Sequence, residues 1–344
     1  MVARGGGAII WSQFTMGVTL SDVAAMAGVS RSAVSRTFNK GGSVSPEMRA
    51  KVEAAAQALG YRPNPLAASL KTGRTGLVAL VCDDFSSAMT LAMQARLTRR
   101  LEAGDRQAVL LNFAEEMEAD EVARRLTDHH VDAAILVSSA LDPSVEKVIR
   151  RSVPATIACL PRHGGGEAGM DEVQTGRLAG RKLVGRGYQS IGYVGGPEGT
   201  VAARRQLAGL QGAVNATGAS ILTQFVPEIS VDAGRAATER LLARATPDVL
   251  FCGDDLLALG ALAALDDLGL SVPEDIGVLG VGDIAMAAWP QFALSTLRPP
   301  KDAIAEMAVA MVVAAINREA MPAPGRLPCR LVNRKTLRPL PPSD

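Results

Sequence analysis

The stretch Val18-Thr-Leu-Ser-Asp-Val-Ala-Ala-Met-Ala-Gly-Val-Ser-Arg-Ser-Ala-Val-Ser-Arg-Thr-Phe-Asn39 decides how the first part of this 344-residue chain folds. Thr19 is a suitable N-cap, and apolar residues follow it at positions 20, 23, 24 and 27, the spacing of one helical face. Gly28 predicts the end of that helix, and Ser30 predicts the start of a second helix. Two short helices joined by so tight a turn predict a helix-turn-helix, whose second helix presents its first residues to the major groove of DNA.

A third helix is predicted after the Gly41–Gly42 loop, with Ser45 as its N-cap, Pro46 at its first position and Gly60 at its end. Such helices could also be a fragment of an ordinary helical bundle. The polar and basic outer face of the second helix favours DNA binding instead. The residues on that face are Arg31, Ser32, Ser35 and Arg36.

Charge is distributed unevenly along the chain although the net charge is only +1. Residues 1–76 contain nine Lys or Arg and three Asp or Glu, whereas the remainder contains 27 and 32. A basic first part indicates a polyanionic partner, and the mildly acidic remainder indicates a different task.

From residue 77 onward, short apolar runs alternate with helical stretches, which is typical of buried parallel strands with crossover helices. We expect an α/β fold that is used twice, in two similar halves of about 85 and 150 residues. The predicted strands are 77–82, 108–112, 133–137, 155–160, 190–194, 221–225, 248–252 and 276–281. The predicted helices are 90–101, 120–129, 174–186, 202–216, 234–243, 256–268 and 301–318.

Nothing in the sequence specifies catalysis, a cofactor or a metal. The four cysteines, at positions 82, 159, 252 and 329, form no C-x-x-C motif, and we expect buried thiols in a reducing compartment. With three histidines, no Ser/His/Asp triad can be argued. The glycine-rich stretches lack G-x-G-x-x-G spacing and a G-K-[ST] signature, which favours turns over phosphate binding. No apolar run reaches the length of a membrane span.

The quoted stretch, together with Val44-Ser-Pro and Leu59-Gly-Tyr-Arg-Pro-Asn64, resembles the DNA-binding domain of the lactose-repressor (LacI/GalR) family of bacterial transcription regulators. The resemblance implies that Arg31, Ser32 and Arg36 read base edges. It also implies a hinge helix over 65–71, which inserts Leu70 into the minor groove. We expect Lys71 to contact a phosphate of the DNA backbone. That segment is too short to be stable alone, so we expect it to fold only on DNA.

The rest of the chain resembles the effector-binding core of that family, a periplasmic-binding-protein-like pair of doubly wound parallel-sheet subdomains. Matching landmarks include Gly187-Tyr-Gln-Ser-Ile-Gly192, Gly253-Asp-Asp-Leu-Leu-Ala-Leu-Gly260 and Leu294-Ser-Thr-Leu297. The resemblance implies a ligand in the cleft between subdomains, at the carboxyl ends of strands. The residues expected around it are Asp83, Asp171, Gln206, Asp254, Gly282 and Asp283. The expected domains are a disordered leader 1–17, a DNA-binding domain 18–64, a hinge and linker 65–76, a core 77–338 and a tail 339–344.

The core departs from the family pattern at three places. Gln206 stands where many sugar-responsive members carry Arg, and Gly280-Val-Gly-Asp283 replaces Gly-Phe-Asp-Asp. Ala88 and Met89 replace an aromatic pair that stacks on ligands. The Gly-x-Gly-Asp variant is similar to the branch that responds to sugar acids such as gluconate. Because a lost carboxylate removes repulsion of an anion, this fits an acidic ligand, although a neutral ligand held by other groups is an open alternative.

We therefore expect a cytoplasmic DNA-binding transcription regulator, acting as a repressor of a carbohydrate or sugar-acid operon. Its expected partners are double-stranded operator DNA, a small sugar or sugar acid, and a second copy of the chain. A solute-binding receptor with the same core is the alternative, but it has no use for a basic head. We expect neither enzymatic activity nor a membrane anchor.

Overall fold

The computed structural model describes residues 18–38, 43–62, 73–82, 87–112, 118–137, 143–159 and 167–341. The chain divides into two compact units, Met1–Thr75 and Gly76–Asp344, which we call the head and the core. The predicted leader 1–17, the hinge 65–71 and residues 342–344 of the predicted tail lie outside the described residues.

The head contains three helices, α1 (Leu20–Ala27), α2 (Arg31–Phe38) and α3 (Pro46–Leu59). The predicted caps are confirmed: Thr19 accepts from the Asp22 backbone N–H in a capping box, and Ser30 accepts from the Ala33 N–H at 3.2 Å. Ser45 caps α3 in the same way. Val23, Val34 and Val52, one from each helix, are fully buried in a common cluster. Their shared burial fixes the tight turn between α1 and α2.

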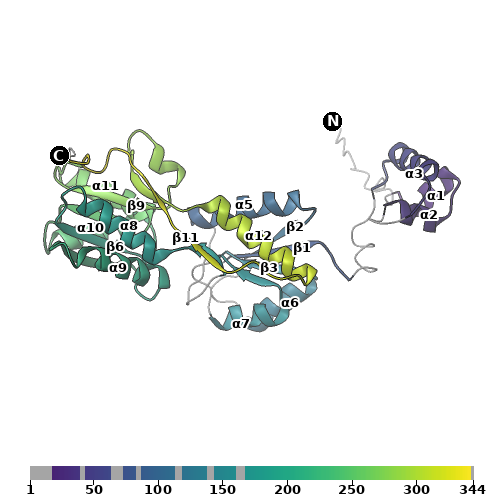
Figure 1. Cartoon of the computed structure of the whole chain (residues 1–344), viewed down its shortest axis with the longest axis horizontal. Coiled ribbons are helices and arrows are strands. Elements are labelled where there is room, and N and C mark those ends of the chain that lie inside the picture. Colours follow the sequence, from purple (N-terminus) through teal and green to yellow (C-terminus); the bar gives the residue numbers. More distant parts are fainter. Residues whose placement is uncertain are drawn as a thin grey trace, which may run out of the picture. The chain divides into compact units, whose positions relative to one another are not determined.

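The core is built on two main sheets (Figure 1). The first has the strand order β2-β1-β3-β4 and the second β12-β10-β9-β8-β6-β7, while β11 pairs with β5. All pairs are parallel except the antiparallel β10–β12 pair. The strands are β1 (Leu77–Cys82), β2 (Gln107–Asn112), β3 (Ala133–Leu136), β4 (Thr156–Ala158), β5 (Ala168–Met170), β6 (Ser190–Gly195), β7 (Ser220–Phe225), β8 (Val249–Cys252), β9 (Gly277–Val281), β10 (Ser295–Arg298), β11 (Gly325–Leu327) and β12 (Arg330–Val332).

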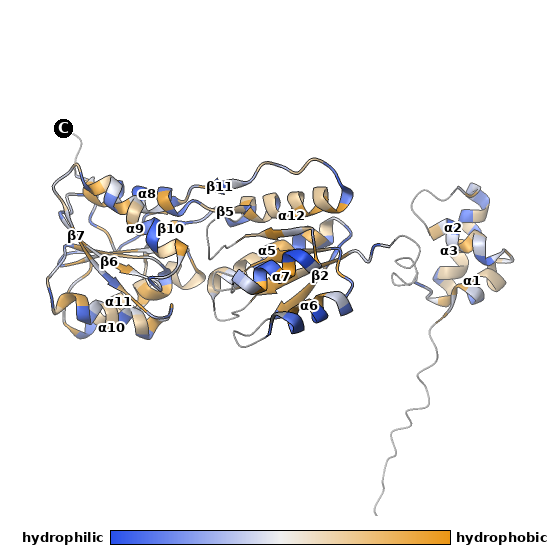
Figure 2. Cartoon of the chain, turned by 90° about the horizontal axis from the view of Figure 1, so that it is seen from below, coloured by the Kyte–Doolittle hydropathy of each residue, from blue (hydrophilic) through white to orange (hydrophobic). Residues whose placement is uncertain are grey.

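Helices cover both faces of each main sheet. They are α5 (Ala88–Ala103), α6 (Ala119–Asp128), α7 (Pro143–Ser152), α8 (Glu172–Val184), α9 (Val201–Val214), α10 (Val231–Leu242), α11 (Asp255–Asp267) and α12 (Lys301–Asn317), with the 3-10 turn η2 (Ala285–Ala288). In β1, Val78 and Leu80 pack toward α5 and α12, whereas Ala79 and Val81 pack toward α6 and α7. This alternation is the period of two expected of a strand buried on both sides. Figure 2 shows the apolar residues gathered on the strands and on the helix sides that face them.

The expected α/β fold class is confirmed, and each predicted strand and helix of the core is present within a few residues. The two halves are confirmed, except that the last helix does not pack in the second half. Helix α12 follows β10 of the second sheet, but Ile304, Ala308 and Met311 pack with β1 and α5 of the first. Figure 1 shows α12 beside α5. The chain therefore crosses between the subdomains more than once, and the sequence pattern also missed α7, β5, β10, β11 and β12.

The four cysteines are free and buried, as predicted. Burial raises the pKa of Cys159 and of Cys329 to about 12, which keeps both thiols protonated and unreactive at neutral pH. In the described part of the chain, no helix is both long and apolar enough to span a membrane.

Candidate DNA-binding and effector-binding sites

The second helix of the head presents the predicted DNA-reading residues. Arg31, Ser32 and Arg36 are exposed on α2, and Ser35 is half-buried. The opposite side of α2 is fixed, because Val34 is fully buried and the Arg49 guanidinium of α3 donates to the Thr37 carbonyl at 3.0 Å. A helix held on one side and polar on the other is suited to enter a groove.

Three of the predicted site residues fall outside the described part of the chain. They are Leu70 and Lys71 of the hinge and Asp83 after β1. Their roles stay predictions.

Asp171, Gln206 and Asp254 come from three different elements of the second subdomain. Asp171 caps α8 by accepting from the Gln174 N–H at 3.0 Å, and Asp254 caps α11 by accepting from the Leu256 N–H at 2.8 Å. Asp254 follows β8 directly, at the carboxyl end of a parallel strand. Such strand ends are the usual ligand sites of open α/β sheets.

Gln206 of α9 joins these positions. Its side-chain nitrogen donates to Glu172 at 2.8 Å, beside Asp171, and its oxygen accepts from the Tyr193 hydroxyl at 3.2 Å. A Cβ at Gly253 would lie 2.8 Å from the Gln206 Oε1, so the loop before Asp254 also touches this amide. Gln206 thus links the start of α8 to the start of α11.

The carboxyl groups around Gln206 titrate far from their ordinary range. Burial raises the pKa of Glu172 to about 7, against the opposing hydrogen bond from Gln206. Burial, followed by the negative charge of Asp255, raises the pKa of Asp254 to about 7. Perturbed carboxyl groups at a strand end are typical of functional sites.

Gly282 and Asp283 follow β9, in backbone conformations with φ of 132° and 48°. The Gly282 carbonyl accepts from the Lys301 ammonium at 2.6 Å. Asp283 forms ion pairs with Arg298 and with Arg334, the second at 2.7 Å. These bonds hold the pKa of Asp283 below its usual range, although burial alone would raise it. The Asp283 carboxylate is therefore already engaged.

Sequence reasoning missed three polar residues of this region. Glu172 bonds Gln206, Asp255 accepts from Ile284 N–H and Thr296 hydroxyl, and Lys301 reaches the β9 loop. Glu172 and Asp255 had a local signal, since they stand beside Asp171 and Asp254 in the sequence. Lys301 is brought in by tertiary packing.

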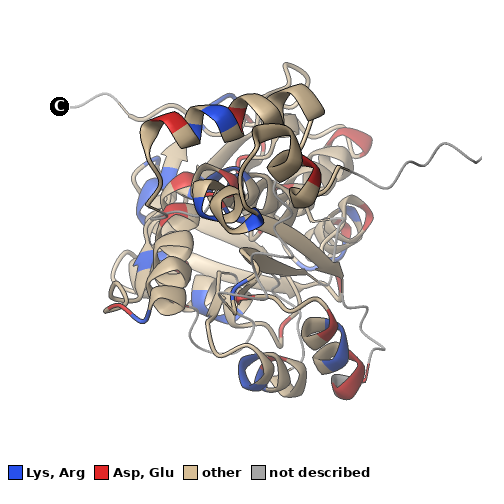
Figure 3. Cartoon of the chain, turned by 90° about the vertical axis from the view of Figure 1, so that its right-hand side faces the viewer, with Lys and Arg blue, Asp and Glu red and all other residues tan. Residues whose placement is uncertain are grey.

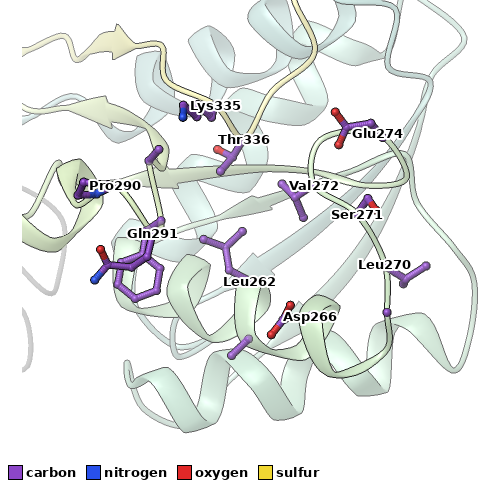
Figure 4. A pocket seen from close by; sticks show the side chains of 14 residues that line it. Leu262, Asp266, Leu270, Ser271, Val272, Glu274, Pro290, Gln291, Lys335 and Thr336 are labelled. Carbon is purple, nitrogen blue, oxygen red and sulfur yellow. The ribbon is translucent and has the colours of Figure 1, made fainter.

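The large hollow of about 830 Å³ beside α11 is a different place (Figure 4). Leu262, Asp266, Val272 and Gln291 are among its lining residues, and none of the predicted effector residues lines it. It gives no support to effector binding there.

A head with a polar, exposed second helix, together with a two-sheet core with polar groups at its strand ends, defines a DNA-binding regulator with an effector-binding domain. Comparisons agree: residues 19–64 match the model for bacterial regulatory proteins of the lacI family, and residues 181–337 match a periplasmic binding protein-like domain. The chain belongs to the lacI family. Members of this family are transcription regulators, so the prediction that the chain is not an enzyme is confirmed.

Relatives match over nearly the whole chain. The transcriptional regulator CelR of Thermobifida fusca is 31% identical over 88% of this chain and 92% of its own. The ribose operon repressor of Escherichia coli K12 is 30% identical over 88% and 94%. A structure of the lac repressor bound to ONPG covers 93% of this chain and 100% of its own, with a TM-score of 0.81 and 26% identity.

Proposed function

We propose that this protein represses a carbohydrate or sugar-acid catabolic operon in the cytoplasm, as a homodimer controlled by a small effector. The observation that carries the proposal is the exposed Arg31, Ser32 and Arg36 face on an otherwise fixed α2. Two solved relatives support the partners: a lac repressor dimer bound to operator and an anti-inducer, and a CelR–cellobiose complex.

We further propose that the effector lies against Asp171, Gln206 and Asp254. Gln206 supports this, since it contacts the elements on both sides. Closure of the subdomains around the ligand would then displace the paired hinges, so that the Leu70 wedges no longer fit one operator.

A mobility-shift assay of the full chain on its own upstream DNA tests the regulator proposal. We expect a shift that unrelated DNA competes for poorly. Equal binding to both DNAs, or none, would contradict the proposal and favour the alternative of a solute-binding receptor.

A further inference from the structure

A second cavity, of about 520 Å³, lies where residues of both subdomains meet. Its volume is in the range of small-molecule sites. Its charged lining residues are Arg96, Asp283, Arg298, Lys301, Asp302 and Arg330. Positive groups outnumber negative ones, and Asp283 is shared with a further cation, Arg334.

Charged residues are rare in the strands of this protein, and two of them line this cavity. Across the described strands, Lys, Arg, Asp and Glu occur at Arg298, Arg326 and Arg330 alone; Figure 3 shows the other charged residues on helices and loops. Arg298 and Arg330 stand directly opposite each other in the antiparallel β10–β12 pair. Like charges opposite each other destabilise a sheet unless a counter-charge lies between them.

The two arginines are compensated unequally. Arg298 has Asp283 as its ion-pair partner. Among the described residues, the Arg330 guanidinium has no hydrogen-bond or ion-pair partner, and Arg330 is exposed. The cavity thus holds a cation whose charge is left for a ligand.

Lys301 adds a buried positive charge to the same cavity. It is only 8% exposed, and its ammonium reaches the Gly282 carbonyl at 2.6 Å. Burial above all, and then the charges of Arg96 and Arg298, lower the pKa of Lys301. An anion in the cavity would reduce this repulsion.

We infer that this cavity binds the anionic group of the effector, through Arg330, Arg298 and Lys301, and that the effector is therefore an acidic carbohydrate. The inference rests on the proposed function and deepens it. A carboxylate and a phosphate share the required chemistry, since both pair with guanidinium groups in bidentate fashion. Asp283, one of the residues predicted around the effector, lines this cavity, and Lys301 donates to the carbonyl of the neighbouring Gly282.

Titration calorimetry on the full chain tests this inference with D-gluconate, D-glucose 6-phosphate and neutral D-glucose. We expect one of the two anions to bind at least about tenfold more tightly than glucose, the scale of one charge-assisted bond. The variant Arg330→Gln should lose most of that preference, because it removes the positive charge that pairs with the anion. The matched control Arg240→Gln, on the exposed last turn of α10, should keep it.

A preference for gluconate identifies a carboxylate ligand, and one for the sugar phosphate identifies a phosphate ligand. Glucose binding as tightly as both anions, an anion preference that survives Arg330→Gln, or no anion binding at millimolar concentration would overturn the inference. The mobility shift on upstream DNA is measured on the same preparations. If DNA binding is specific while the anion preference is absent, only the anion site is wrong; if DNA binding fails, the regulator proposal is wrong.

Discussion

At the scale of the residue, we expect two carboxyl groups of the proposed effector site to make ligand affinity depend on pH. Glu172 and Asp254 both have a pKa raised to about 7. Asp171, Arg205 and Arg326 also act on Glu172 electrostatically, but burial is the largest cause. Because these carboxyl groups ionise across the physiological range, they repel a bound anion more strongly at pH 8 than at pH 6.

We predict that gluconate affinity rises as pH falls from 8 to 6. A bound anion raises the pKa of each carboxyl group further, so binding takes up protons, and the gain is limited to about tenfold per pH unit for each proton taken up. Calorimetry at three pH values measures the slope. Glu172→Gln should reduce the slope and D-glucose should show little; a rise in affinity with pH would contradict the prediction.

At the DNA-reading face, we predict that Arg36→Ala weakens cognate operator binding by about 1–3 kcal/mol and random DNA binding little, as for the loss of a base contact. Arg36 is exposed on α2, and within the described part of the head its Nε donates to the Ser32 carbonyl of its own helix, at 3.3 Å. Lys71→Ala, the predicted backbone contact, should weaken both alike. Equal losses on both DNAs for Arg36→Ala would reject base reading.

The role of a residue can be predicted from sequence where its close neighbours in the chain determine that role. Thr19, Ser30 and Ser45 each cap the helix that follows directly, so a few neighbouring residues decide them. Glu172 and Gln206 meet only because α8 packs on α9, and no local spacing records that contact.

The pair of helices α8 and α9 depends on small residues where the two backbones approach. A Cβ at Gly176 would overlap the Gln206 carbonyl oxygen and lie 2.9 Å from the Leu210 nitrogen. A Cβ at Gly209 would likewise overlap the Val173 carbonyl oxygen. This close approach positions Gln206, because its own backbone forms part of the contact.

We therefore predict that Gly176→Ala destabilises the core by about 1–3 kcal/mol or more, the usual cost of overpacking. It should also weaken effector binding, since α9 carries Gln206. Gly212→Ala is the matched control: Gly212 lies in α9, the helix that packs against α8, is exposed and has open space around it. Alanine there should stabilise by up to about 1 kcal/mol. Thermal unfolding of both variants measures the difference, and equal melting temperatures would refute the helix contact.

The sequence predicts a helix or strand where apolar residues recur at a regular spacing, but it does not predict which elements pack together. The burial pattern of β1 and the length of α12 follow from apolar spacing. Helix α12 packs on the first sheet because the chain returns to the first subdomain after β10. Pairs that are distant in sequence hold it there, such as the ion pair of Arg96 with Asp302 at 3.1 Å. The same holds for Arg298 and Arg330, which are 32 positions apart in sequence and opposite in the sheet.

At the scale of the whole molecule, the chain passes from the second main sheet to the first subdomain between β10 and α12. Two of the cavity cations, Arg298 and Lys301, stand at this crossing. A ligand bound to these cations would contact the segment that connects the two subdomains. A difference in ligand affinity between two subdomain arrangements is the physical requirement for control of DNA binding.

We predict a reciprocal coupling between effector and operator of roughly 1–3 kcal/mol, or about 5–150-fold, the usual range for such linkage. If the acidic effector induces transcription, saturating operator DNA should weaken gluconate binding by some factor, and saturating gluconate should weaken operator binding by the same factor. A corepressor would strengthen both equally. Calorimetry with and without operator gives the first factor, and mobility shifts with and without gluconate give the second. An unchanged effector affinity in the presence of operator would contradict the coupling.

The variant Arg330→Gln removes the anion contact and leaves the head unchanged. It should therefore keep operator affinity while losing the response to gluconate.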